Sequence, residues 1–455
     1  MSDSTIDPAR IRAAVTGEVI GPDDSRYDEA RSVFYGGFDY RPAVIVRPAG
    51  TEDVARAVGL AAETGAELAI RSGGHSLAGH STTEGGVVLD LGAMRELEID
   101  LAARTAWAET GLTAGEYTSA VGEHGLATGF GDTGSVGIGG ITLSGGIGFL
   151  ARRHGLTIDS VVGAEVVTAD GRILAIDADS HPDLFWAIRG GGGNFGVVTR
   201  LGFRLHPVSG IVGGMLVLPA SPEVVAQFVE EAEGASEDLT TIANLMVAPP
   251  MPFLPPEVHG RLVLVALMAH TGDTETGTAD VGRFRNLAEP LADTLQPMRY
   301  PQLFIEEPPD FHPTAVGINL FTDAFDVADA KTAISHLEAS TAMASVVQLR
   351  VLGGAVSRVP ADATAFAHRD RKMMLNVAAM YQDPGEVELH TRWVRGLADA
   401  LRRGDDGAYS GFVGAGDDSG PERAYPPATW QRLRAVKRRY DPGNLFRLNL
   451  NIPPA

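Results

Sequence analysis

The sequence predicts an α+β protein made of two differently patterned parts and a short C-terminal segment. Up to about residue 207, short apolar strands alternate with glycine-rich loops and short helices. After residue 207, longer apolar strands alternate with amphipathic helices, a pattern typical of an antiparallel sheet flanked by helices. Because 455 residues suffice for two or three domains, we expect one domain over residues 1–207, a second over 208–420 and a returning segment over 421–455.

The first part begins with a strand, a helix and a second strand. Residues 43–46 form an apolar strand, and the helix from Thr51 carries acidic residues in its first turn and stops at Gly65. A strand over residues 67–71 then leads directly into a glycine turn that ends at His75. Further strands are predicted over residues 87–91, 105–109, 162–168, 172–177 and 196–205.

The second part contains longer elements. Apolar runs predict strands over residues 210–218, 261–269, 346–352 and 373–381. Amphipathic stretches predict helices over residues 222–233, 328–340 and 388–402. In the C-terminal segment, residues 430–437 form a basic helix that ends before the turn Asp441-Pro442-Gly443.

The composition narrows the classes of function. A formal net charge of −21 makes nucleic acid and anionic membranes poor partners, because both bind to basic surfaces. The absence of cysteine excludes disulfides, thiolate metal sites and cysteine nucleophiles, and no metal site is expected. Residues 1–18 contain no long apolar run that would predict a signal peptide or an anchor, so we expect a cytoplasmic protein.

The turn Gly73-Gly74-His75 is the most informative local feature. Two glycines allow the backbone to lie flat against a large planar ligand. The imidazole that follows could then act on that ligand as a hydrogen-bond partner, a metal ligand or a nucleophile. The alternative interpretation is a turn at the end of a strand, with a histidine on the surface.

Two further glycine-rich segments offer many backbone N–H groups. Residues 191–196 match the spacing of a dinucleotide loop, but a helix precedes them and a strand follows, the reverse of a Rossmann unit. The segments 129–148 and 190–196 could instead hold a pyrophosphate through backbone amides. Alternatively, these glycines serve tight loops in an irregular β fold.

Taken together, four segments in this order resemble the berberine-bridge-enzyme-like group of the vanillyl-alcohol-oxidase superfamily of flavoproteins. They are residues 71–75, 136–148, 189–199 and 440–452. Residues 17–25 and 368–370 further resemble the 6-hydroxynicotine oxidase branch of this group. The resemblance implies a two-part PCMH-type FAD-binding domain and a substrate domain whose antiparallel sheet covers the flavin ring.

The resemblance also implies how FAD is bound. His75 matches the histidine that bonds covalently to the flavin. Thr133 stands where many relatives carry a second, cysteinyl bond, so a single linkage is expected. Val136 matches a position at which valine accompanies access of oxygen to the flavin. The other expected cofactor-binding residues are Arg71, Ser72, Gly73, Gly74, Ser76, Gly137, Gly139, Gly140, Gly145, Gly146, Gly193, Asn194, Gly196, Val197, Asn449 and Asn451.

His80 is the other histidine near the glycine turn. It matches no histidine of the family, and we interpret it as a residue that is solvated or packs within its loop.

The substrate site is expected on the strands of the second part. Gln348, Arg350 and Asn376 should face the cofactor, although a shift of one residue in register would turn them outward. The related branch carries a carboxylate where this chain has Arg350. We therefore expect a preference for anionic or hydroxyl-rich substrates over protonated amines.

The proton acceptor is expected to be Tyr425 or Tyr381, with Arg350 lowering the pKa of the tyrosine. Both tyrosines could equally be structural residues with satisfied hydroxyl groups.

The predicted function is that of an FAD-dependent oxidase. It would transfer hydride from a carbon of a small alcohol, sugar or amine to FAD, with dioxygen as the acceptor and hydrogen peroxide as the product. One alternative is a dehydrogenase with another acceptor, and a second is a flavin-binding biosynthetic protein without such turnover. The expected partners are the small-molecule substrate and dioxygen, with neither nucleic acid nor membrane, for a monomer or homodimer.

Overall fold

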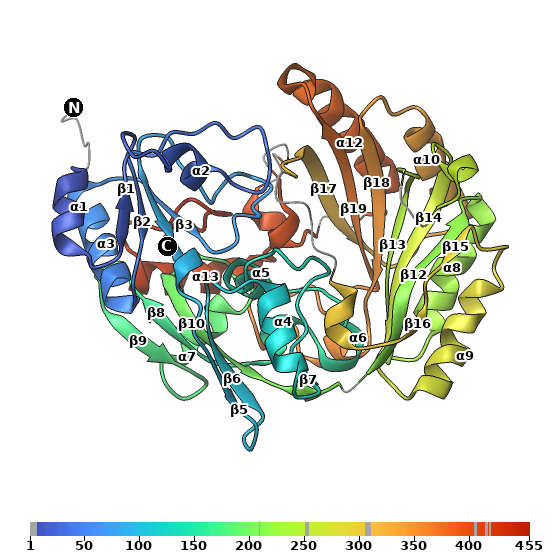
Figure 1. The fold of residues 1–455 in the computed structure, drawn as a ribbon, viewed down its shortest axis with the longest axis horizontal. Helices are drawn as coiled ribbons and strands as arrows, with labels where there is room; N and C mark the ends of the chain where they lie inside the picture. The colour runs from blue at the N-terminus through green and yellow to red at the C-terminus, as the bar shows by residue number, and fades with distance from the viewer. Residues whose placement is uncertain are drawn as a thin grey trace.

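Three main sheets organise the structure, a computed structural model that describes residues 7–208, 210–250, 254–304, 311–404, 407–414, 417 and 420–455. Two of the sheets belong to the N-terminal region, and the third and largest stands beside them (Figure 1). The predicted α+β class is confirmed. All strands of the large sheet lie within residues 211–381. The domain boundaries at residues 207 and 420 stay a prediction.

The first sheet has four strands in the order β1-β2-β4-β3. Strands β2 and β3 both run parallel to β4, which lies between them in the sheet. The two strands of the predicted strand–helix–strand unit, β2 and β3, are therefore not direct neighbours. Gly65 ends helix α3 with φ of +68°, a conformation that favours glycine. The elements are β1 (Glu18–Ile20), β2 (Val44–Arg47), α3 (Thr51–Thr64), β3 (Leu68–Arg71) and β4 (Val87–Asp90), with α1 (Pro8–Ala14) and α2 (Tyr27–Arg31) preceding β2.

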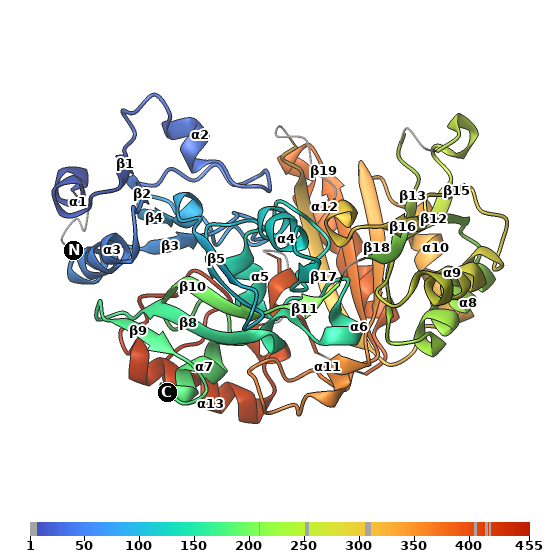
Figure 2. The ribbon, with the colours of Figure 1, turned by 60° about the horizontal axis from the view of Figure 1, so that its bottom comes forward.

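The second sheet is antiparallel, with the order β5-β6-β10-β8-β9. Helix α13 returns from the C-terminal segment and lies beside α7 under this sheet (Figure 2). The Arg432 guanidinium stacks on Trp186 with 3.7 Å to the ring centroid. The elements are β5 (Leu97–Asp100), β6 (Thr105–Glu109), α4 (Ala114–Gly122), α5 (Ile138–Ser144), β8 (Val161–Val167), β9 (Ile173–Ile176), α7 (Pro182–Ile188), β10 (Val197–Arg204) and α13 (Pro427–Tyr440).

The large sheet is antiparallel throughout, in the order β15-β12-β14-β13-β18-β19-β17, with β16 paired to β12. Its strands are β12 (Ile211–Pro219), β13 (Leu239–Val247), β14 (Leu262–His270), β15 (Ala292–Asp293), β16 (Gln296–Met298), β17 (Thr314–Thr322), β18 (Ala344–Val351) and β19 (Met373–Tyr381).

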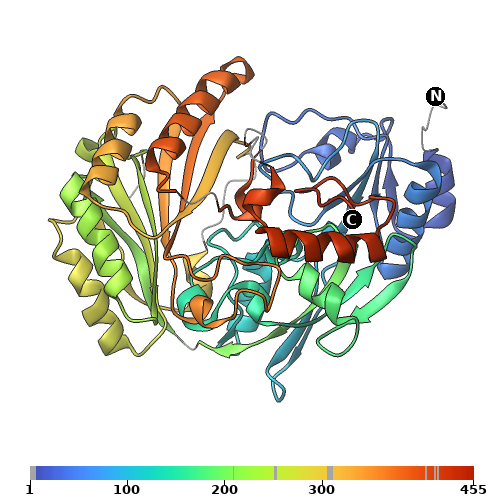
Figure 3. The same cartoon turned by 180° about the vertical axis from the view of Figure 1, so that it is seen from behind.

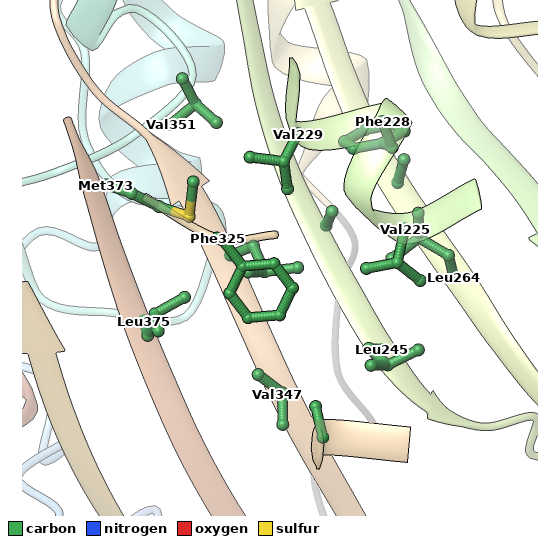
Figure 4. Packing of buried hydrophobic residues seen from close by; sticks show 14 of the residues in the cluster. Val225, Phe228, Val229, Leu245, Leu264, Phe325, Val347, Val351, Met373 and Leu375 are labelled. Atoms are coloured by element: carbon green, nitrogen blue, oxygen red, sulfur yellow. The ribbon is translucent and has the colours of Figure 1, made fainter. Parts of the chain in front are cut away.

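Four longer helices cover the outer face of the large sheet (Figures 1 and 3). They are α8 (Pro222–Gly234), α9 (Thr274–Arg285), α10 (Val327–Glu338) and α12 (Val387–Leu401). Phe228, Leu245, Val347 and Leu375 pack between the sheet and these helices (Figure 4). Since successive side chains of a strand point to opposite faces, the residues between these core positions face the N-terminal region.

The remaining elements are short. They are β7 (Leu126–Ala127), α6 (Ala151–His154), β11 (His206–Pro207), α11 (Ala355–Arg358) and 3₁₀ helices at Leu91–Ala93, Thr157–Asp159, Pro256–Val258, Tyr300–Leu303, Pro384–Glu386, Ser410–Phe412 and Pro421–Arg423. Within the described ranges, no helix has the length and apolar character needed to cross a membrane.

Candidate functional site

A cavity of about 570 Å³ lies between the glycine-rich loops and the open face of the large sheet. Its size falls in the range of small-molecule and cofactor sites. Phe446 and residues 448–450 of the C-terminal tail complete the lining. The expected site residues that line the cavity are Ser72, Gly73, Gly74, His75, Ser76, Thr133, Val136, Gly137, Gly139, Gly140, Gly193, Asn194, Gly196, Gln348, Arg350, Asn376, Tyr425 and Asn449.

The two principal glycine loops touch backbone to backbone. A Cβ atom added to Gly73 would lie 2.2 Å from the Gly137 nitrogen, and one added to Gly137 would lie 2.2 Å from the Gly73 nitrogen. Side chains at these positions would therefore push the loops apart. Gly140 and Gly193 differ, because no atom lies within 4 Å of where their Cβ would be. These glycines leave room beside the backbone.

His75 projects into the lining from the first of these loops. Its ring stacks on Phe34, with 3.9 Å between the ring centroids and 19° between the planes. Burial lowers the pKa of the imidazole to about 4, against a smaller opposing effect of a hydrogen bond with the Ser135 backbone. The imidazole is therefore neutral at neutral pH and keeps a nucleophilic lone pair.

A row of carboxamides crosses the open face of the large sheet. Asn244, Gln348, Asn376 and Asn319 lie directly opposite one another on β13, β18, β19 and β17. Gln348 Nε2 donates to Asn244 Oδ1 at 2.9 Å, and Asn319 Nδ2 donates to the Tyr409 carbonyl oxygen at 3.1 Å. Asn376 Oδ1 is buried and has no hydrogen-bond partner among the described residues.

Arg350 lies next to this row and bridges the two regions. Its Nε donates to Gln348 Oε1 at 2.8 Å, its Nη1 to the Ile147 carbonyl at 2.8 Å and its Nη2 to Asp132 Oδ2 at 2.9 Å. The side chain is buried and its charge is compensated by Asp132. The expectation that Arg350 offers a free positive charge to anionic substrates is therefore corrected.

The sequence did not single out Asp132, although it precedes Thr133 in a cavity-lining loop. It is the only carboxylate in the lining formed by the described residues. Because its partner Arg350 lies more than 200 positions later in the sequence, only the tertiary structure reveals the pair.

The two predicted tyrosines occupy different places. Tyr381 lies on the face of β19 that the helices cover, in the hydrophobic core. Its ring stacks there on His390 with 4.9 Å between the ring centroids. It cannot reach the cavity. Tyr425 does line the cavity, but its hydroxyl donates to the Gly190 carbonyl at 3.3 Å, and burial raises its pKa. A tyrosine with a raised pKa is a poor proton acceptor at neutral pH.

Tyr409 is a lining residue that sequence reasoning missed. Its hydroxyl oxygen accepts a hydrogen bond from the Gly146 N–H at 3.0 Å. Burial raises its pKa to about 12, although nearby Arg350 acts in the opposite direction. The residue follows a stretch without apolar periodicity, so no local signal indicated that it packs against the glycine loop.

Five expected cofactor residues lie outside the cavity lining: Arg71, Gly145, Gly146, Val197 and Asn451. Arg71 instead donates to the carbonyls of Ala30 and Ser32 and pairs with Asp90, which fixes the segment just before Phe34. Gly146 has φ of +77°, and a Cβ there would lie 1.9 Å from Thr157 Oγ1. These two residues shape the loops that bear the lining.

His80 lies in a turn, where its N–H donates to Ser76 Oγ at 3.2 Å, and it also lines the cavity. Burial lowers the pKa of its imidazole to about 4, so this ring too is neutral at neutral pH.

A buried lysine holds the C-terminal tail against the cavity. Lys437 Nζ donates to the carbonyls of Asn194 and Phe446, both at 2.8 Å, and to Asp441 Oδ2 at 2.7 Å. Asn194 Oδ1 in turn accepts from the Ile452 N–H at 2.9 Å. These bonds connect the glycine loop before β10 to both ends of the tail.

The lining fits FAD. The glycine loops present backbone amides that can hold a diphosphate, with space beside Gly140 and Gly193. Asn449 Oδ1 is a buried acceptor that lacks a partner within the described residues, as expected where a polar ring system binds. In the same part of the chain, no group of three or more side chains is arranged to hold a metal ion.

Comparisons with known proteins agree with this geometry. Residues 42–177 match the FAD binding domain family, and residues 413–453 match the berberine and berberine-like family. The chain is 31% identical to (R)-6-hydroxynicotine oxidase of Paenarthrobacter nicotinovorans, over 97% of both chains. It is 28% identical to xylooligosaccharide oxidase of Thermothelomyces thermophilus, over 93% of this chain and 90% of the relative.

A comparison with solved structures agrees with the sequence comparison. The structure of 6-hydroxy-D-nicotine oxidase from Arthrobacter nicotinovorans matches with a TM-score of 0.83 and 27% identity, over 97% of this chain and 98% of that one. Similarity along nearly the whole length, together with the glycine loops around His75, confirms the resemblance found in the sequence. The chain thus belongs to the berberine-bridge-enzyme-like family of FAD-dependent oxidoreductases.

Proposed function

We propose that the protein is an oxidase that takes hydride from a carbon bearing a hydroxyl or amino group and passes the electrons to dioxygen. The observation that carries the proposal is the neutral imidazole of His75, set in a cavity that a polar sheet face closes on the other side. Relatives named as oxidases of 6-hydroxynicotine and of xylooligosaccharides support the reaction class. Val136 in the lining supports access of oxygen.

FAD supplies the two-electron acceptor when it is bound. His75 would hold it through one covalent bond, because a neutral ring nitrogen can attack an electrophilic carbon. The absence of cysteine from the chain supports a single linkage. Ser72, Ser76 and Asn449 would bind and orient the cofactor from their places in the lining.

Asp132 replaces the tyrosines as the proposed proton acceptor. Arg350 binds one carboxylate oxygen, and the side chain keeps 19% of its surface exposed. An oriented carboxylate in the lining can take the proton of a substrate hydroxyl as the carbon loses hydride. Gln348 holds Arg350 in this position.

Anaerobic mixing of the purified protein with xylobiose, secondary alcohols and amines tests the function. We expect at least one compound to bleach the flavin absorbance, and admission of dioxygen to restore the colour and release one hydrogen peroxide per flavin. Bleaching without peroxide would indicate a dehydrogenase. A flavin that dithionite reduces but no compound does would indicate a binding protein without this turnover.

We also propose that the protein acts in the cytoplasm as a monomer or homodimer on a small-molecule substrate. The acidic net charge of −21 supports the exclusion of nucleic acid and anionic membranes as partners. Light scattering of the purified protein measures the oligomeric state directly.

A further inference from the structure

We propose that the substrate is a compact, uncharged and largely apolar alcohol whose hydroxyl oxygen accepts a hydrogen bond from Asn376, which leaves the hydroxyl proton free to pass to Asp132. This inference rests on the proposed oxidase function and names the substrate class for the same site.

The open face of the large sheet changes from polar to apolar within one step along the strands. The amide row lies beside a row formed by Met246, Val346 and Ala378, which are directly opposite one another. Met380 and Ala315, also paired, extend the apolar surface. All five side chains line the cavity. Alternate residues of a strand are only about 7 Å apart, so a substrate anchored at the amides soon rests on apolar side chains.

Aromatic side chains from other elements also line the cavity. Phe34 and Phe311 line the cavity with 6.1 Å between their ring centroids, and Phe34 packs edge-on against Tyr35 at 5.0 Å. Phe311 is 38% exposed, which places it where the lining meets solvent. These rings add further apolar surface to the lining.

The lining offers no net charge to a substrate. Arg350 and Asp132 are its only arginine, lysine or carboxylate side chains among the described residues, and they neutralise each other. His75 and His80 are neutral at neutral pH. A charged substrate would lose its hydration without gaining a counter-charge, which disfavours both anions and protonated amines.

One side chain of the row in the lining forms no hydrogen bond with the described residues. Asn244 and Gln348 bond to each other, and Gln348 Oε1 also accepts from Arg350. Asn376 lines the cavity and forms no such bond. Its amide nitrogen can therefore donate a hydrogen bond to the substrate. A hydroxyl oxygen accepts that bond without adding charge.

An oligosaccharide fits this surface poorly. It carries hydroxyl groups along its whole length, and those beyond the amide row would face Met246, Val346 and Ala378 without hydrogen bonds. The inference therefore gives this chain a different substrate class from the relatives named as oligosaccharide oxidases.

Titration of the flavin-loaded protein under anaerobic conditions tests the inference. The probes are 1-phenylethanol, xylobiose, mandelate and 1-phenylethylamine at pH 7, and perturbation or bleaching of the flavin spectrum reports binding. We expect 1-phenylethanol to bind at least tenfold more tightly than each of the other three. Asn376→Leu should weaken the binding of 1-phenylethanol at least threefold while the flavin content stays unchanged.

Tyr381→Phe is the matched control, because it removes a hydroxyl from the opposite face of the same strand and should leave binding unchanged. Equal or tighter binding of xylobiose or of a charged probe, binding of no probe, or full affinity in Asn376→Leu would overturn the inference. Lack of flavin, or failure of dioxygen to reoxidise reduced flavin, would contradict the proposed function and, with it, the inference. Tight binding of xylobiose to an intact oxidase contradicts the substrate class alone.

Discussion

At the scale of single residues, the surroundings of His75 explain its chemistry. An imidazole becomes a useful nucleophile when it is neutral and held in one orientation. Burial lowers its pKa to about 4, and the Phe34 ring fixes the plane of the imidazole at 3.9 Å. Phe34 itself is held by its N–H, which donates to the Gly74 carbonyl at 3.2 Å. We therefore infer that Phe34 positions His75 for bonding to the cofactor.

Phe34→Ala should slow covalent attachment of FAD about threefold to tenfold, because aromatic pairs contribute roughly 0.5–1.5 kcal/mol beyond burial. The rate is measured as pigment that precipitates with acid-denatured protein after FAD is added to flavin-poor protein. Phe412→Ala is the control, since Phe412 lines the cavity under Arg350 rather than beside His75. Equal rates in the Phe34 variant and the wild type would argue against positioning by Phe34.

Asp132→Asn should make the cavity selective for anions. The substitution leaves the Arg350 charge without its counter-charge while preserving the shape of the side chain. We expect mandelate to bind at least threefold more tightly than to the wild type, as read from the flavin spectrum. Unchanged mandelate affinity would mean that Asp132 does not set the charge of this end of the cavity.

At the scale of elements, four of the strands of the large sheet could be predicted from the sequence: β12, β14, β18 and β19. The apolar run of β19 was predicted with the bounds observed. The strands β13 and β17 were missed. They carry Asn244 and Asn319 of the amide row, so the full row could be assembled only from the structure.

The sequence alone could have shown that Tyr381 and Asn376 do not both lie in the site. Asn376 and Tyr381 are an odd number of positions apart on one strand, so they must point to opposite faces. By contrast, Asp132, Phe34 and Tyr409 join the site only through tertiary contacts. No local pattern in the sequence marks them.

The buried lysine of α13 gives a prediction for the C-terminal tail. Lys437→Met would leave the fully buried Asp441 carboxylate without its positive partner. We expect the free energy of unfolding to fall by about 3–5 kcal/mol, together with a loss of bound FAD, because the tail lines the cavity. Urea denaturation and flavin content measure both effects. A loss below about 1 kcal/mol with full flavin content would show that the tail is held by other contacts.

At the scale of the whole molecule, several histidines make stability depend on pH. His154 and His206 stack at 4.1 Å, and burial lowers their pKa values to about 3 and about 4. An unfolded chain protonates these histidines near pH 6.5, whereas the folded chain does not. Protonation therefore favours the unfolded state, and folding stability decreases as the pH falls from about 6.5 towards 4.

Chemical denaturation at pH 7.0, 6.0 and 5.0 measures how the free energy of unfolding depends on pH. These values lie above the pH range in which most carboxyl groups titrate. The free energy of unfolding should fall at each step. The double variant His154→Gln/His206→Gln should show a smaller decrease. A stability that is constant or rises between pH 7.0 and 5.0 would contradict the neutral, buried state of these rings.

Acid precipitation of the wild type and of His75→Ala, both expressed with ample riboflavin, tests the central claim most directly. If FAD is bonded to His75 alone, the wild-type pellet is yellow and fluoresces on a denaturing gel, while the His75→Ala protein leaves its flavin in the supernatant. Flavin that stays free in the wild type, or remains bonded in His75→Ala, would contradict the account.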